Sequence, residues 1–312
     1  MVLASAHKRL FPFSEKMLKR AYFSNRLLPY LLILPQLLII LIFFYWPAAQ
    51  ALFQSFMLSD PFGVRSQFVW LYNFRHLFED PLYWKSIGIT FIFSFLTTML
   101  SLSAGLLTAA LANRVLKAKS AIRTFLIWPY AVAPAISGVL WMFIFHPAFG
   151  IISRLPTQWL GITWNPILNG NDALFLVIIA SAWKQSSYNF VFFIAGLQSI
   201  PKSLIEAAAI DGAGPFRRFW IISFPLLSPT LFFLMVMNVV YAFFETFGII
   251  HTVTQGGPGG ATMTMIYKVY RDGFVGLDLG SSAAQSVVLM IVIVALTLFQ
   301  FKYIEKKVQY AG

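Results

Sequence analysis

Two ionisable side chains, Lys184 and Glu245, lie inside apolar runs that are long enough to cross a membrane. A charged group at membrane depth is costly, so it usually binds a ligand, pairs with another group or lines a polar path. Hydrogen-bonding side chains accompany both groups at spacings of three, four or seven, which place them on shared helix faces. We therefore predict two polar stripes lining a path through the membrane, formed by Lys184, Tyr188, Asn189, Asn238, Tyr241 and Glu245. A second interpretation stays open, in which Lys184 and Glu245 pair with each other or with backbone groups as a structural bridge.

The chain lacks the residue patterns of an enzyme. It has no cysteine, and its four histidines are scattered. No Ser/His/Asp set, HExxH motif or cluster of metal ligands occurs at membrane depth. The glycine-rich run 255–260 contains no GxxxxGK[ST] motif, so it is not a nucleotide-binding loop. We predict no catalytic residue, no metal site and no cofactor bound by this chain, and we interpret run 255–260 as a flexible turn.

A short polar island, residues 203–219, separates two long apolar runs. Ser203 and Glu206 have the spacing of a capping box, which predicts a helix starting at about Leu204. Gly212 and Gly214 are expected to end that helix, and Pro215 suits the first turn of the next one. Glu206 has a purely structural interpretation as a cap. The three alanines at 207–209, however, leave a bare face that another protein can approach closely.

Composition places the rest of the chain in a membrane. Of the 312 residues, 59% are hydrophobic and 11% are charged, against about 25% charged in soluble proteins. Pro129 and Pro134 are expected to kink the third apolar run. The first run follows a basic tail, as in a signal peptide, but it is too long for one, so we interpret it as an uncleaved span. We predict an all-α polytopic membrane protein with six transmembrane helices at about 28–48, 87–112, 125–145, 173–197, 224–250 and 281–301.

The distribution of charge predicts the orientation. If both termini lie inside, 16 Lys and Arg residues fall on the inner side and 6 on the outer side, as the positive-inside rule requires. We therefore expect a cytoplasmic basic tail at 1–27, a six-span domain at 28–301 with a cytoplasmic loop at 201–223, and a cytoplasmic tail at 302–312. The net charge of +12 then follows from topology and proximity to lipid, and it does not indicate nucleic-acid binding.

The polar island also carries a family pattern. It contains Glu206-Ala207-Ala208, Asp211-Gly212-Ala213, Phe219, Ile222, Pro225 and Pro229. This pattern resembles the EAA loop of permease subunits in bacterial ABC importers, with Phe224 where that family usually has Leu. The resemblance covers about residues 27–310 and includes the segments 28–32, 128–135, 183–185 and 281–290. Among carbohydrate-type permeases, these segments most resemble the A-type permeases of sn-glycerol-3-phosphate importers.

The resemblance implies a type I (MetI-like) permease fold and a multi-pass location in the bacterial inner membrane. It implies a coupling helix that contacts a cytoplasmic ATPase through Glu206, Ala207, Ala208, Asp211 and Gly212. The implied partners are a second homologous permease in a heterodimer, two ABC ATPase subunits that bind and hydrolyse ATP with Mg²⁺, a periplasmic binding protein and the lipid bilayer. The implied substrate is sn-glycerol-3-phosphate or a glycerophosphodiester, and run 255–260 is then a loop reaching towards the binding protein or its ligand.

Three alternatives remain at this level. The same machinery can import a neutral sugar or polyol, since only the finer resemblance favours glycerol phosphate. Glu245 would repel a phosphate unless it is paired, which weighs against a tight phosphate site beside it. An ion-coupled secondary transporter would show broken spans in two repeated halves, and no such repeat is present. A membrane enzyme would need a catalytic set that the chain lacks.

Overall fold

The structure is a computed structural model that describes residues 27–60, 66–114, 119–153, 161 and 163–307. The predicted basic tail at 1–27 lies outside the described residues as far as residue 26, and the predicted tail at 302–312 does so from residue 308. The chain divides into two compact units, residues 1–53 and 54–312.

The described part of the first unit, residues 27–53, is formed by one apolar helix. It consists of α2 (Leu28–Ile40), a π-helical turn at Leu41–Tyr45 and α3 (Trp46–Gln54), the last residue of which begins the second unit. The continuous helix has 27 residues and a mean hydropathy of 2.3. At 1.5 Å per residue, that length exceeds the roughly 30 Å of a bilayer core. The helical character predicted for residues 28–48 is confirmed, and the helix extends further.

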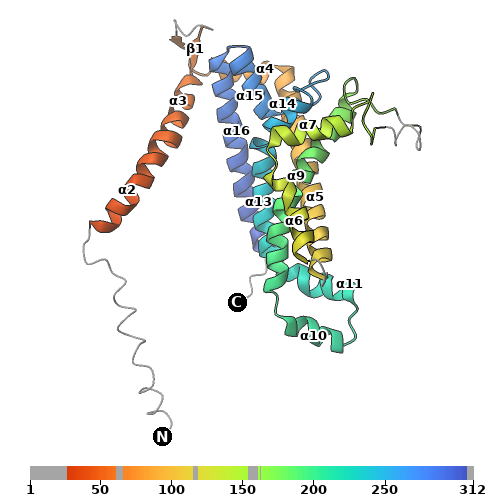
Figure 1. The fold of residues 1–312 in the computed structure, drawn as a ribbon. Coiled ribbons are helices and arrows are strands. Elements are labelled where there is room, and N and C mark those ends of the chain that lie inside the picture. Colours follow the sequence, from red (N-terminus) through yellow and green to blue (C-terminus); the bar gives the residue numbers. More distant parts are fainter. Residues whose placement is uncertain (1–26, 61–65, 115–118, 154–160, 162, 308–312) are drawn as a thin grey trace. The chain divides into compact units, whose positions relative to one another are not determined.

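The second unit is a helical bundle with a small hairpin that the sequence did not predict (Figure 1). Strands β1 (Met57–Ser59) and β2 (Ser66–Phe68) pair antiparallel, and α4 (Tyr72–Glu79) follows them. Asn73 donates from Nδ2 to the carbonyls of Ser55 and Met57 at 2.9 Å each. The side chain of one α4 residue therefore joins this helix to the hairpin.

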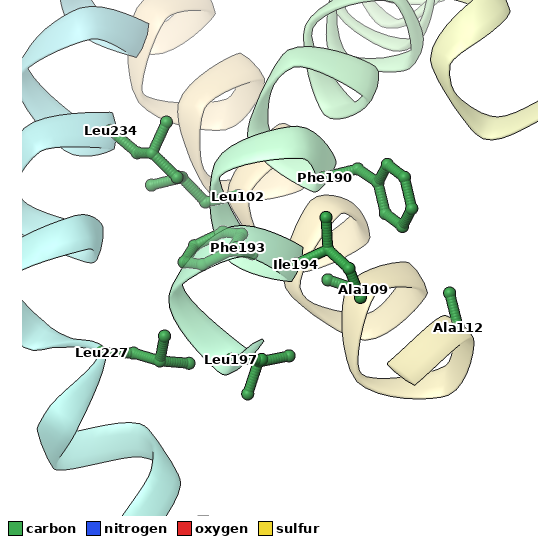
Figure 2. Packing of buried hydrophobic residues seen from close by; sticks show 9 residues of the cluster. All are labelled: Leu102, Ala109, Ala112, Phe190, Phe193, Ile194, Leu197, Leu227 and Leu234. Atoms are coloured by element: carbon green, nitrogen blue, oxygen red, sulfur yellow. The ribbon is translucent and has the colours of Figure 1, made fainter. Parts of the chain in front are cut away.

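Helices α5 (Pro81–Arg114) and α9 (Gly170–Ser199) form the most extensive helix pair in the bundle. Gly105 makes this possible, because a Cβ there would lie 2.5 Å from the Cβ of Asn189. Close backbone approach matters in a membrane, where lipid is as apolar as the side chains and packing drives association. Figure 2 shows the resulting core, which is formed by Leu102, Ala109, Ala112, Phe190, Phe193, Ile194, Leu197, Leu227 and Leu234.

The third predicted span is more sharply broken than a kink. Helices α6 (Lys119–Ala131) and α7 (Pro134–Ile144) meet at 103°. Pro134 has no N–H to continue α6, and the residue before a proline favours extended backbone. Ala133 accordingly has φ −59° and ψ 143°. The interruption expected at Pro134 is therefore present and is larger than a kink, whereas Pro129 lies inside α6.

The fifth predicted span, 224–250, is also interrupted. The continuous helix Pro215–Leu226, which ends in α12 (Phe224–Leu226), bends by 67° into α13 (Ser228–Phe244), and α13 ends before Glu245. A separate helix, α14 (Phe247–Val253), follows. Beyond it come α15 (Met265–Tyr270) with a π-helical turn at Arg271–Val275, and α16 (Leu279–Phe299), which continues through turns at Gln300–Ile304 and Glu305–Lys307.

Three described helices are long and apolar enough to span a membrane, and the number rises to six if each bent pair counts as one span. The all-helical, membrane-spanning class predicted from the sequence is confirmed. The two ends of the second unit differ (Figure 1). Helices α10 (Lys202–Ile210) and α11 (Pro215–Arg218) project from one end, called here the α10 end. Helices α4, α14 and α15 lie at the opposite end, called the α15 end.

Candidate functional site

Helix α10 forms where the polar island predicted a helix, but its start differs from the prediction. The helix begins at Lys202, Pro201 is the N-cap residue, and no side chain caps it. The capping box of Ser203 and Glu206 is therefore wrong. The reason is Pro201: the residue before it, Ile200, is extended at ψ 126° and ends α9, as proline requires. Helical geometry then starts directly after the proline, which places Ser203 inside the first turn.

The end of α10 follows the prediction closely. Gly212 adopts φ +79°, a left-handed conformation that favours glycine. The Ala213 N–H donates to the Ala208 carbonyl at 2.9 Å, and the Gly212 N–H donates to the Ala209 carbonyl at 3.1 Å. These two bonds define a Schellman motif. Pro215 then begins α11, as expected.

Helix α11 is tied back to α10. The Arg218 Nη1 atom donates to the Ile205 carbonyl at 3.4 Å. Together with the Schellman turn, this contact fixes the path of the chain between two short helices. The α10–α11 element is thus a defined projection of the bundle.

The outward surface of this projection combines charge with exposed apolar groups. Glu206 and Asp211 are exposed, and Ile210 and Phe216 are 87% and 76% exposed. Glu206 and Ile210 are four apart and therefore share one face of α10. Large exposed apolar side chains rimmed by charge mark protein contacts. The sequence prediction missed Ile210 and Phe216, although their signal was available: a large apolar residue in a short polar connector.

Lys184 lies at the break between α6 and α7. Its Nζ atom donates to the Tyr130 carbonyl at 3.3 Å and lies 5.1 Å from the centre of the Tyr130 ring. That carbonyl would accept from residue 134 in a continuous helix, but Pro134 has no N–H to donate. Tyr188, one turn after Lys184 on α9, places its ring 5.6 Å from that of Tyr130. The structure therefore brings Lys184 and Tyr188 together, on the shared face that their spacing predicts.

Three other predicted path residues lie in the interior of the bundle. Asn189 and Asn238 exchange amide hydrogen bonds of 2.7 and 3.1 Å, and Ser101 donates to Asn238 at 2.6 Å. Tyr241 donates to the Ser181 carbonyl at 3.2 Å. All of these side chains are buried, so they join α5, α9 and α13. The described arrangement places them in the packing between these helices.

Glu245 stands apart from this network. It lies just past the end of α13 and is exposed. Within the described part of the chain, no ion pair joins it to Lys184. Of the two structural bridges that the sequence left open, the arrangement contains the one from Lys184 to the backbone.

At the α15 end, rings from α14 and α15 form an aromatic cluster. His251 Nδ1 lies 3.4 Å from the Tyr267 hydroxyl, and Phe247 stacks on both rings. Burial raises the pKa of Tyr267, the neighbouring Tyr270 raises it further, and Arg271 partly offsets both. The hydroxyl therefore keeps its proton at neutral pH. This cluster holds α15 against α14.

Apolar helices, an interior polar network and a projection with exposed charged and apolar side chains define a polytopic helical membrane protein. The chain belongs to the family described as binding-protein-dependent transport system inner membrane components, whose model matches residues 5–310. It is thus a permease subunit of the ABC importer class. The relationship to ABC importer permeases expected from the polar island is confirmed.

Relatives with specific names cover nearly the whole chain. A protein of Brucella abortus biovar 1 (strain 9-941) is 57% identical, covering 94% of this chain and 100% of the relative. A protein of Rhizobium meliloti (strain 1021) is 57% identical over the same shares. One from Pectobacterium atrosepticum is 54% identical and covers 93% of this chain and 98% of the relative. Each is named sn-glycerol-3-phosphate transport system permease protein UgpA.

Solved structures agree on the fold. A bacterial ABC transporter involved in the import of the acidic polysaccharide alginate matches with a TM-score of 0.77 and 21% identity, covering 91% of this chain and 96% of that one. The MetNI methionine ABC transporter in an inward-facing conformation matches with a TM-score of 0.52 and 14% identity, covering 73% and 97%. The MetI-like permease fold predicted from the sequence is confirmed.

Proposed function

We propose that this chain is the transmembrane subunit of an ATP-driven importer that carries sn-glycerol-3-phosphate or glycerophosphodiesters across the bacterial inner membrane. The observation that carries this proposal is the set of relatives that are 54–57% identical over 93–94% of the chain and bear that substrate in their names. Similarity at that level extends over the spans, the projection and both ends of the bundle.

In the proposed mechanism, α10 is the coupling helix. ATP and Mg²⁺ are bound and hydrolysed by two separate ATPase subunits, and closure of those subunits pushes on α10. Glu206 pairs with a basic residue of the ATPase, Ala207 and Ala208 allow close approach, and Asp211 with Gly212 ends the helix. The exposed side chains of Ile210 and Phe216 support this role, because burying them against a partner removes apolar surface from water.

The other proposed partners are a second homologous permease, which completes a heterodimeric pore, and a periplasmic binding protein. An alginate ABC transporter of similar fold has been solved in complex with an alginate pentasaccharide-bound periplasmic protein. The excess of Lys and Arg on the predicted inner segments supports a cytoplasmic α10 end, with both termini inside. The α15 end and run 255–260 then face the periplasm, where the binding protein delivers its ligand.

For the path itself, the contacts of Lys184 support a refined assignment. Its amine has three donors, and one of them holds the Tyr130 carbonyl. The remaining donors, together with Tyr188 and the exposed Glu245, are the proposed polar groups along the path. Asn189, Asn238 and Tyr241 act in the same region as the hydrogen-bonded packing that keeps α9 and α13 in register.

Uptake by cells tests the substrate. We expect radiolabelled sn-glycerol-3-phosphate to enter cells that express the complete importer and not cells that lack this subunit. Excess unlabelled glycerophosphodiester should compete, whereas excess glycerol or a neutral disaccharide should not. If the neutral compounds compete instead, the substrate is a neutral sugar or polyol. The assignment of the permease fold would be unaffected.

A further inference from the structure

A cavity of about 540 Å³ lies at the α15 end of the second unit. Its walls come from the start of α5, the glycine-rich run 255–260, and α15 with the turn that follows it. Ligand sites for small molecules commonly have volumes of about 300–1,000 Å³. Its charged lining residues converge from different parts of the chain and are Lys85, Lys268, Arg271 and Asp272.

One of the three cations is already neutralised. Lys268 is 9% exposed and pairs with Asp272 at 2.9 Å and with Asp80 at 3.2 Å. Lys85 donates to the Gly259 carbonyl at 2.8 Å, which uses one of its three donors. The guanidinium group of Arg271 makes no hydrogen bond or ion pair with any residue that the structure describes. The cavity therefore has two cationic groups with donors to spare.

The glycine-rich run supplies further donors. Gly256, Gly259 and Gly260 line the cavity, and none of their backbone N–H groups donates to another group within the described ranges. Glycine carries no side chain that would keep a ligand away from these groups. Backbone N–H groups beside cations are a recurrent arrangement for holding oxyanions.

Asp272 gives the cavity a fixed acceptor. Its Oδ2 atom accepts from Lys268 at 2.9 Å and from Gln285 Nε2 at 2.6 Å. These contacts come from α15 and α16, so the carboxylate is held in place before any ligand arrives. A carboxylate has further acceptor positions, which suit a hydroxyl group.

We propose that this cavity binds a small organophosphate that also carries hydroxyl groups. Lys85, Arg271 and the glycine N–H groups hold the phosphate, and Asp272 accepts a hydrogen bond from a hydroxyl. A phosphate monoester carries a charge of about −1.5 to −2 at neutral pH, which matches two unpaired cations. The proposal rests on the proposed function and deepens it: the cavity receives sn-glycerol-3-phosphate on the permease before it crosses the membrane.

A binding measurement on the complete importer tests this site. The importer is reconstituted in lipid nanodiscs without ATP or binding protein, and equilibrium binding of radiolabelled sn-glycerol-3-phosphate is measured, with inorganic phosphate as a second probe. Lys85→Gln and Arg271→Gln each remove a charge but retain hydrogen-bonding capacity. We expect each variant to bind about tenfold more weakly, as for the loss of one charge-assisted hydrogen bond.

The matched control is Arg75→Gln, which removes a charge from an exposed pair with Glu79 on the neighbouring α4, and it should bind normally. Unchanged affinity in both cavity variants would overturn the site. Attachment of the binding protein is measured in a separate experiment. If the cavity variants weaken that attachment and leave anion binding unchanged, the two cations serve docking of the binding protein and the proposed anion site is overturned. Equal affinity for inorganic phosphate would overturn the role of Asp272. Failure of the proposed function is seen separately, as absence of sn-glycerol-3-phosphate uptake by the unsubstituted importer.

Discussion

At the residue scale, the Nζ atom of Lys184 has both a structural role and a proposed role along the path. Pro134 removes the backbone donor for the Tyr130 carbonyl, and the Lys184 amine donates to that carbonyl. An unsatisfied carbonyl in the bundle would cost roughly 1–3 kcal/mol. The same amine keeps donors and a positive charge for an anion. The structural bridge and the path lining that the sequence left as alternatives are thus compatible.

Two substitutions separate these roles. Lys184→Met removes both the donor and the charge, whereas Lys184→Gln removes the charge and keeps N–H donors. If both roles hold, Lys184→Met lowers the thermal unfolding midpoint of the purified importer and Lys184→Gln largely preserves it. Both should reduce sn-glycerol-3-phosphate uptake about tenfold, since each loses a charge-assisted contact with the anion. Normal uptake by Lys184→Gln at normal expression would leave the amine with the structural role alone.

The sequence patterns identified polar residues of interest, but they did not identify the contacts that these residues make. The sequence singled out Asn189 as part of a polar run on one span and Asn238 by its spacing to Tyr241 on another. Their contacts with each other and with Ser101 join positions 49 and 137 residues apart, which only packing determines. Glu245 was assigned to the same stripe as Asn238, but α13 ends one residue before it. Residues share a helix face only while the helix continues, so Glu245 does not extend the face that carries Asn238.

At the element scale, the polar island was predicted better at its end than at its start. Glycine is the strongest determinant of a left-handed C-terminal residue, so Gly212 ended α10 as expected. The start depended on a competition between a capping side chain and a proline, and Pro201 prevailed because it fixes its own backbone and that of the preceding residue. Pro134 restricts the residue before it in the same way, and the chain bends there by 103°, which is more than the predicted kink.

The coupling role of α10 gives a prediction at this scale. Glu206→Lys reverses an exposed charge without removing any contact within the second unit. We expect it to insert normally and to reduce uptake by tenfold or more, because a cation would then face the basic residue proposed on the ATPase. Uptake, the amount of ATPase that copurifies and ATP hydrolysis are measured together.

Arg75→Glu serves as the matched control, since it reverses an exposed charge on α4 at the opposite end. It should leave uptake and ATPase attachment unchanged. If Glu206→Lys transports as well as this control, α10 does not couple the chain to an ATPase through Glu206.

At the scale of the whole molecule, orientation connects the separate proposals. The α10 end must face the cytoplasm for an ATPase to reach it, and the α15 end must face the periplasm for its cavity to receive substrate. The charge asymmetry of the sequence predicts this arrangement through the positive-inside rule. Packing alone does not determine it, because the same bundle can be inserted with either end inward.

The absence of native cysteine allows orientation to be measured without background. Ile210→Cys and Leu168→Cys place a thiol at the α10 end and the α15 end, at positions that are 87% and 78% exposed. A membrane-impermeant maleimide should label Leu168→Cys in right-side-out spheroplasts and Ile210→Cys only in inverted vesicles. Phe95→Cys, near the middle of α5, should react in neither, because a thiol in apolar surroundings stays protonated and unreactive. The reverse labelling pattern would place the cavity in the cytoplasm and α10 in the periplasm, and it would refute ATPase coupling and substrate reception together.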